Sequence, residues 1–141
     1  MQEYFKFFTP VQVRYAETDA QGHVFFGNYF TYYDLALTEY FKAVGYSYET
    51  LLADGLDFYY VEALCQYKGR AFFDEILHVH TRISKIGTTS FTVEFAVFEE
   101  NSDRPITTGR IVAVAVDREA EKPTRVPEGL RRAVEDFENV V

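Results

Sequence analysis

The sequence contains only one cysteine, Cys65, and no tryptophan. A single cysteine excludes a disulfide within the chain and favours a reducing compartment, so we expect a cytoplasmic protein. The residues that follow Met1 form no secretory signal pattern, and no apolar run approaches the roughly 20 residues of a membrane span. We therefore expect no membrane-spanning segment.

Basic residues are fewer than acidic ones. The 14 Lys and Arg residues stand against 22 Asp and Glu residues, which gives a formal net charge of −8. Nucleic acids and anionic membrane surfaces need a basic face on their partner, so this balance argues against both. Glycine-rich phosphate-binding motifs are absent, and no nucleotide-dependent chemistry is predicted. An anionic small molecule needs only a local cluster of cations, and the sequence does not exclude it.

Metal ligands are sparse as well. His78 and His80 alternate along one predicted strand, but no third ligand accompanies them in the sequence. A zinc site needs three or four ligands, so we predict two solvated histidines and neither a metal nor another cofactor. Cys65 lacks a neighbouring cysteine or histidine pattern, which favours a buried or interfacial thiol.

Aromatic residues, by contrast, are abundant. The sequence has 14 Phe and 11 Tyr residues, which bring its aromatic fraction to 18%. A chain of 141 residues, 48% of them apolar, can bury one core, so residues 1–141 are assigned to a single domain. The aromatic surplus leaves surface for a partner subunit or an apolar ligand.

The periodicity of apolar residues predicts an α+β fold. Helical spacing runs from Asn28, the expected N-cap, to Val44, and Gly45 follows as the terminating residue. Strands are expected at Tyr4–Tyr15, Leu56–Tyr67, Ile76–Ile86, Ser90–Phe98 and Thr107–Asp117, with short helices at 47–53 and 127–137. This order predicts a five-stranded antiparallel sheet that wraps around one long central helix.

The segment before the predicted long helix contains a candidate catalytic residue. Asp19 precedes a loop, bounded by Gly22 and Gly27, that leads directly into the helix. Helix N-termini present unpaired N–H groups and a partial positive charge, which polarise a carbonyl or stabilise an oxyanion. A carboxylate beside such donors can serve acyl transfer as base or nucleophile. An isolated aspartate there is by default a turn residue, and Glu17 is expected to be a solvated neighbour.

This segment resembles the signature of hotdog-fold thioesterases of the 4-hydroxybenzoyl-CoA thioesterase type, especially the Tol-Pal-associated bacterial acyl-CoA thioesterases. The matching residues are Tyr15, Thr18, Asp19, Gly22, His23, Val24, Asn28, Tyr29 and Tyr33, followed by 67–77, 85–91, Asp117 and 125–127. The resemblance implies hydrolysis of acyl-CoA or aryl-CoA thioesters, with Asp19 as nucleophile or general base. It also implies a homodimer or a tetramer of dimers, with the sites at the interface.

The resemblance assigns roles to further residues. The backbone N–H of Phe26 or Gly27 would polarise the thioester carbonyl, and the junction Phe26, Gly27, Asn28 and Tyr29 would contact the substrate. His23 would orient the acyl group or assist protonation, and packing against a partner chain is the alternative. For the CoA phosphates the sequence offers Lys85, Thr88, Thr89 and Ser90 in one turn, and Arg70 in a second short basic run; solvated surface is the plainer interpretation of both.

The sequence is also compatible with two other functions. A non-catalytic module that binds acyl groups or CoA would not need the carboxylate of Asp19. A thioesterase for acyl-carrier-protein substrates would need a basic docking surface near its pocket. Two carboxylates on the predicted helix, Asp34 and Glu39, are expected to make surface or interfacial hydrogen bonds.

Overall fold

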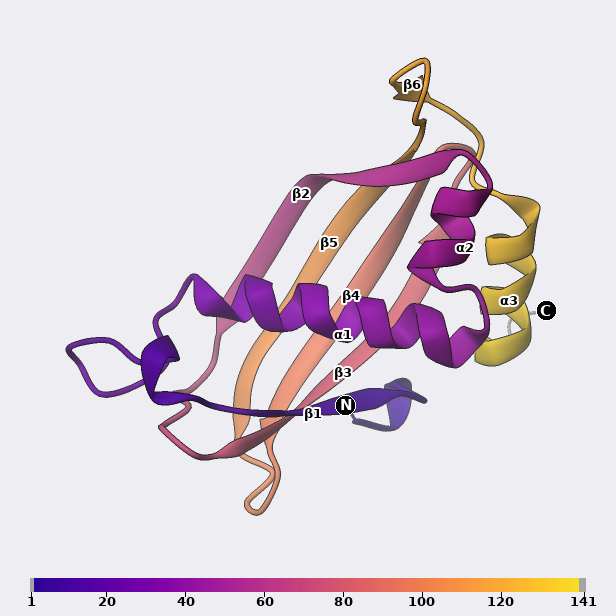
Figure 1. Ribbon diagram of the computed structural model, residues 1–141. Helices are drawn as coiled ribbons and strands as arrows, with labels where there is room; N and C mark the ends of the chain where they lie inside the picture. Colours follow the sequence, from indigo (N-terminus) through magenta and orange to yellow (C-terminus); the bar gives the residue numbers. More distant parts are fainter. Residues whose placement is uncertain (1, 140–141) are drawn as a thin grey trace.

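The computed structural model describes residues 2–139, in which a curved sheet lies against the long helix α1 (Figure 1). In chain order the elements are η1 (Gln2–Tyr4), β1 (Phe8–Gln12), η2 (Tyr15–Glu17), α1 (Asn28–Val44), α2 (Tyr48–Ala53), β2 (Leu56–Tyr67), β3 (Ile76–Ile86), β4 (Ser90–Glu99), β5 (Pro105–Asp117), β6 (Lys122–Pro123) and α3 (Glu128–Glu138). No helix in residues 2–139 is long and apolar enough to cross a lipid bilayer.

The strands form one sheet in the order β1-β3-β4-β5-β2, and every neighbouring pair is antiparallel. This confirms the predicted five-stranded arrangement, to which the two-residue strand β6 adds a short pairing with β5. Strands β2 and β3 have the predicted bounds. Strand β1 is shorter than predicted, because Tyr4 and Tyr15 belong to turns of 3₁₀ helix that flank it.

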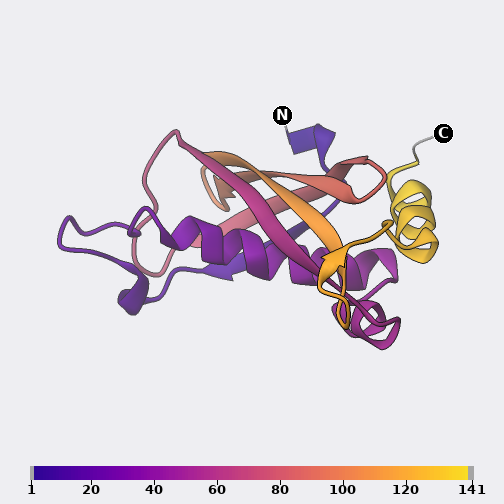
Figure 2. The same ribbon diagram turned by 90° about the horizontal axis from the view of Figure 1, so that it is seen from above.

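Helix α1 also has the predicted bounds and runs along one face of the sheet (Figure 2). It ends at Gly45, whose φ of 92° is a left-handed conformation that glycine adopts without a steric penalty. The predicted N-cap was wrong by one residue. Gly27 is the cap, and Asn28 is the first helical residue, with a side-chain amide that donates to the backbone carbonyl of Glu17 at 2.9 Å.

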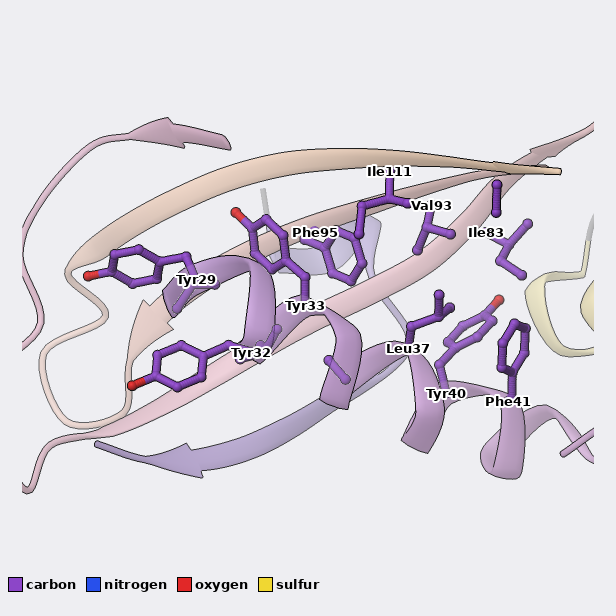
Figure 3. Close-up of a cluster of buried hydrophobic side chains, with 14 of the residues drawn as sticks. Tyr29, Tyr32, Tyr33, Leu37, Tyr40, Phe41, Ile83, Val93, Phe95 and Ile111 are labelled. Atoms are coloured by element: carbon purple, nitrogen blue, oxygen red, sulfur yellow. The ribbon is translucent and has the colours of Figure 1, made fainter. Parts of the chain in front are cut away.

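Tyr33 connects α1 to the middle of the sheet (Figure 3). Its ring is fully buried and stacks on Phe95, with 4.2 Å between ring centroids and 7° between ring planes. Its hydroxyl lies 2.7 Å from Oγ1 of the buried Thr107 and 3.4 Å from Sγ of the half-buried Cys65. Gly109 gives the ring its space, because a Cβ at that position would lie 2.6 Å from Cζ of Tyr33.

The opposite face of the sheet holds the two strand histidines. His78 is half-buried and stacks on Phe8, with 4.2 Å between ring centroids. The prediction of a solvated His80 was wrong: its side chain is only 6% exposed and is surrounded by three aromatic rings. One of them, Phe5, lies in the N-terminal segment that folds across this face. Burial, followed by the proximity of His78, lowers the pKa of His80 below its ordinary value.

Candidate active site

Asp19 opens a tight hairpin between η2 and α1. Its backbone carbonyl accepts from the amide of Gly22 at 2.9 Å, and its own amide donates to the carbonyl of His23 at 3.0 Å. Gly22 has a φ of 86°, so the turn needs a residue that tolerates the left-handed region. Oδ1 of Asp19 accepts from the amide of Gln21 at 2.9 Å, whereas Oδ2 accepts from no group in residues 2–139. Oδ1 therefore stabilises the turn, whereas Oδ2 is available to a ligand or a water molecule.

Glu17 fastens this hairpin to the neighbouring elements. Its carboxylate pairs with Arg14 at 2.7 Å and accepts from the hydroxyl of Tyr32 at 2.8 Å. Burial opposes its ionisation, but the hydrogen bonds from Arg14 and Tyr32 outweigh burial and lower the pKa of Glu17. The expectation of a solvated Glu17 was therefore wrong. The carboxylate of Glu17 links the hairpin to α1, and no motif in the local sequence indicates that Tyr32 is its partner there.

The junction between the hairpin and α1 presents free backbone donors. The amides of Gly27, the N-cap, and of Phe26 just before it donate to no acceptor among the described residues. An unpaired amide is expected at the N-cap, because the first N–H groups of a helix have no partner within it. The carbonyl of Phe26 accepts from the hydroxyl of Tyr67 at 2.9 Å, which fixes the orientation of the peptide that follows. These are the donors predicted to polarise a thioester carbonyl.

A cavity of about 340 Å³ adjoins this junction. Its lining residues are His23, Val24, Phe26, Tyr29, Tyr67, Lys68, Gly69 and Arg70. Burial raises the pKa of Tyr29 to about 12, so this phenol stays protonated at neutral pH. The fold thus brings together the predicted His23, Phe26, Tyr29 and Arg70, with Gly27 and Asn28 adjacent along the chain. Asp19 belongs to the same hairpin as His23 but does not line the cavity.

The second predicted CoA-binding segment lies elsewhere in the chain. The turn from Lys85 to Ser90 contacts the region around α3, since the carbonyl of Thr88 accepts from Val126 at 2.8 Å and that of Gly87 accepts from Arg131. Helix α3 packs against the C-terminal part of α1, at the opposite end from Asn28 (Figure 1). Within one chain this turn does not share a site with Asp19.

The other carboxylates make the surface hydrogen bonds that were predicted. Asp34 accepts from the hydroxyl of Tyr60, and Glu39 accepts from Lys42 at 3.2 Å. Asp34 also lines a cavity of about 470 Å³ between α1 and β2, together with Asp57 and Tyr48. Residues 2–139 contain no group of three or more His, Cys, Asp or Glu side chains arranged to hold a metal ion.

Comparison with known proteins identifies the family. The model of the thioesterase-like superfamily matches residues 13–134. A putative esterase of Aquifex aeolicus is 34% identical over 90 residues, which are 64% of this chain and 70% of that protein. The acyl-CoA thioester hydrolase YbgC of Escherichia coli is 29% identical over 122 residues, which are 86% of this chain and 90% of the relative.

The solved structures agree with this result. The DHNA-CoA thioesterase of Staphylococcus aureus superposes on this chain with a TM-score of 0.86 and 25% sequence identity, over 94% of this chain and 91% of the other. These likenesses confirm both the α+β hotdog fold and the resemblance to thioesterases of the 4-hydroxybenzoyl-CoA thioesterase type. Because the family model covers most of the chain, this protein belongs to the thioesterase-like superfamily.

Proposed function

We propose that this protein hydrolyses acyl-CoA or aryl-CoA thioesters to a free acid and CoA, with Asp19 as nucleophile or general base. The observation that carries the proposal is the free carboxylate oxygen of Asp19 in the hairpin that leads to the unengaged amides of Phe26 and Gly27. The relatives support the substrate class, since one is named an acyl-CoA thioester hydrolase and another a DHNA-CoA thioesterase.

In the proposed reaction, the thioester carbonyl oxygen accepts from the junction amides, which stabilise the negative charge that develops on it. As a general base, Asp19 takes a proton from a water molecule that attacks the carbonyl carbon. As a nucleophile, it attacks that carbon itself and forms an anhydride, which water then hydrolyses. In both cases the carbon–sulfur bond breaks and CoA leaves as a thiolate, which takes up a proton; His23 beside the cavity is the proposed donor.

The cavity next to the junction is the proposed site for the acyl and CoA portions of the substrate, with the reacting carbonyl at its rim between the junction amides and Asp19. The rings of Phe26 and Tyr29 offer an apolar wall beside the backbone donors. Arg70 supplies a cation for the CoA phosphates, which bind guanidinium groups well. Lys85, Thr88, Thr89 and Ser90 can contact the same CoA molecule only when a second chain brings its turn to this site.

Homo-oligomerisation is part of the proposal. Strand β2 forms an edge of the sheet, and its exposed residues include Tyr59, Val61 and Leu64. A long, apolar edge strand is an open pairing surface, and a second copy of the same strand would cover it. A homodimer or a tetramer of dimers is therefore the proposed active form. The cytoplasm is the proposed location, where Cys65 would stay reduced.

The direct test is turnover on a panel of short-chain, long-chain and aryl-CoA thioesters, with release of free CoA as the readout. Activity on none of them would refute the proposed function. The role of Asp19 is tested by a single turnover in H₂¹⁸O, followed by mass spectrometry. Label in the carboxylate of Asp19 identifies a nucleophile whose anhydride is opened at the Asp19 carbonyl. Label in the product acid alone arises from a general base or from an anhydride that water opens at the acyl carbon, and trapping of the anhydride in a rapid quench separates these two routes.

A further inference from the structure

The connection between β2 and β3, residues 68–75, packs against the Asp19 hairpin. His23 forms a bridge with Phe72, and the amide of Val24 donates to the carbonyl of Ala71 at 2.9 Å. The carbonyl of His23 in turn accepts from the amide of Asp19 at 3.0 Å. The placement of both candidate catalytic residues therefore depends on where this connection lies.

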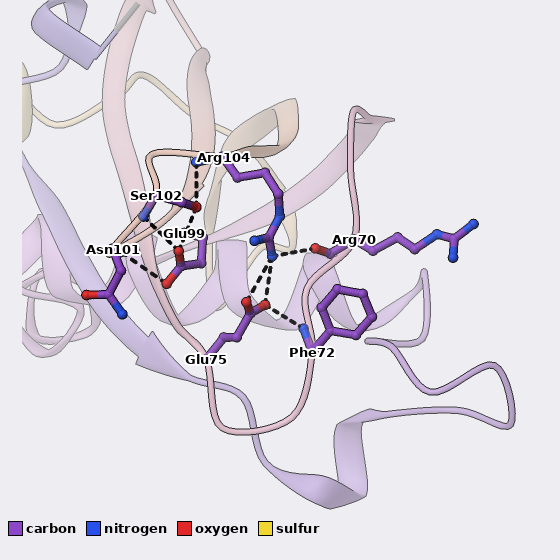
Figure 4. A network of polar contacts seen from close by, with 7 residues as sticks. All are labelled: Arg70, Phe72, Glu75, Glu99, Asn101, Ser102 and Arg104. Carbon is purple, nitrogen blue, oxygen red and sulfur yellow. Dashed lines mark hydrogen bonds and ion pairs between the residues drawn. The ribbon is translucent and has the colours of Figure 1, made fainter.

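Arg104, in the turn just before β5, holds the connection in place (Figure 4). Its Nη2 lies 2.8 Å from Oε1 and 3.0 Å from Oε2 of Glu75, and donates to the backbone carbonyl of Arg70 at 2.9 Å. Oε1 of Glu75 also accepts from the amide of Phe72 at 2.7 Å. The pair is partly buried, with side-chain exposures of 37% for Arg104 and 24% for Glu75. Charge-assisted bonds in such surroundings are stronger than an isolated surface pair.

The turn that carries Arg104 is itself fixed. The carboxylate of Glu99 accepts from the amides of Asn101 and Ser102 at 3.0 and 2.9 Å, and from the hydroxyl of Ser102 at 2.7 Å. These bonds, led by the one from Asn101, lower the pKa of Glu99 and keep it ionised. Arg104 thus reaches Glu75 from a turn that several hydrogen bonds hold.

We infer that Arg104 and Glu75 are positioning residues for the proposed hydrolysis: their ion pair fixes the β2–β3 connection, which orients the hairpin of His23 and Asp19. The inference deepens the proposed function and rests on it. In Figure 4 the side chain of Arg70 extends away from this network, and only its backbone carbonyl accepts from Arg104. Its guanidinium therefore stays available to the cavity that it lines.

The kinetic test compares Arg104→Met with Arg104→Lys and a matched control. Arg82→Met is the control, because Arg82 on β3 is also partly buried and donates to a backbone carbonyl, that of Tyr4 at 2.9 Å, with Glu138 as its carboxylate neighbour at 3.8 Å. We expect Arg104→Met to lower kcat about 10- to 100-fold with KM within about twofold, since small displacements of reacting groups are costly. Arg104→Lys should restore part of kcat, and Arg82→Met should leave it unchanged. An equal loss in both Met variants, or a change in KM alone, would overturn the inference.

A second test needs no substrate. The chain has only three histidines, so NMR signals of the imidazoles of His23, His78 and His80 are easily assigned. We expect Arg104→Met to shift or broaden the His23 signals and to leave the other two unchanged. Unaltered His23 signals, or equal changes in all three rings, would contradict a positioning role. Because this readout is independent of turnover, a wild-type protein without thioesterase activity would refute the proposed function and leave this test intact.

Discussion

The substitution Asp19→Asn separates the chemistry of this carboxylate from its place in the fold. Oδ1 of Asp19 accepts from the amide of Gln21 at 2.9 Å, and the amide oxygen of asparagine can make the same bond. The hairpin should therefore keep its shape, and the free energy of unfolding should change by no more than about 0.5 kcal/mol. The variant nevertheless loses both the negative charge and the basicity.

We expect kcat of this variant to fall by about 10²- to 10⁴-fold, the range for removal of a general base. That corresponds to roughly 3–5 kcal/mol of lost transition-state stabilisation, because each tenfold in rate is about 1.4 kcal/mol. KM should stay within about threefold, since the cavity next to the junction is unchanged. The assay is steady-state release of free CoA on the best substrate of the panel, with thermal unfolding measured in parallel.

Asp117→Asn is the matched control. Oδ1 of Asp117 accepts from the amide of Glu119, two residues further on, at 3.0 Å, so the substitution changes the same kind of turn away from the site. Its kcat should equal that of the wild type. Near-normal turnover by Asp19→Asn would refute the mechanism, and Asp34 and Glu39 on α1 would then be the next carboxylates to substitute.

Three further predictions follow from other parts of the structure. The folded state disfavours protonation of His80, whereas the unfolded chain binds that proton with a pKa of about 6.5. The free energy of unfolding should therefore fall as the pH drops below about 6.5. In chemical denaturation, His80→Leu should lack this part of the pH dependence, and a profile identical to that of the wild type would contradict the argument. Gly109→Ala should destabilise the fold by about 1–3 kcal/mol through overlap with the ring of Tyr33, and an unchanged melting temperature would count against this packing. Arg70→Met should raise KM for acyl-CoA about tenfold with a smaller effect on kcat, which is the signature of a remote phosphate contact. Lys85→Glu should raise KM in the same way only if the Lys85–Ser90 turn of a second chain reaches the site. Unchanged KM in both variants would place the phosphates elsewhere.

Local patterns in the sequence were sufficient for the main elements. Helix α1 and strands β2 and β3 have the predicted bounds, because apolar spacing and terminating residues such as Gly45 act within a few positions of each other. The candidate hairpin was also predictable, since Asp19, Gly22 and His23 are neighbours along the chain. Residues so close along the chain are held near one another in space by the backbone, whatever the rest of the fold is.

Contacts between distant segments depended on the tertiary structure. Arg104 and Glu75 are 29 residues apart, and neither belongs to a local motif that indicates the other. His80 is buried because a segment more than 70 residues earlier folds over its face of the sheet. Ion pairs and burial of this kind form only when the sheet places remote strands side by side. The apolar periodicity within one strand does not indicate which strand will pair with it. The sequence determined the elements and the chemistry they carry, whereas strand order decided which side chains meet, because these contacts form across the sheet rather than along the chain.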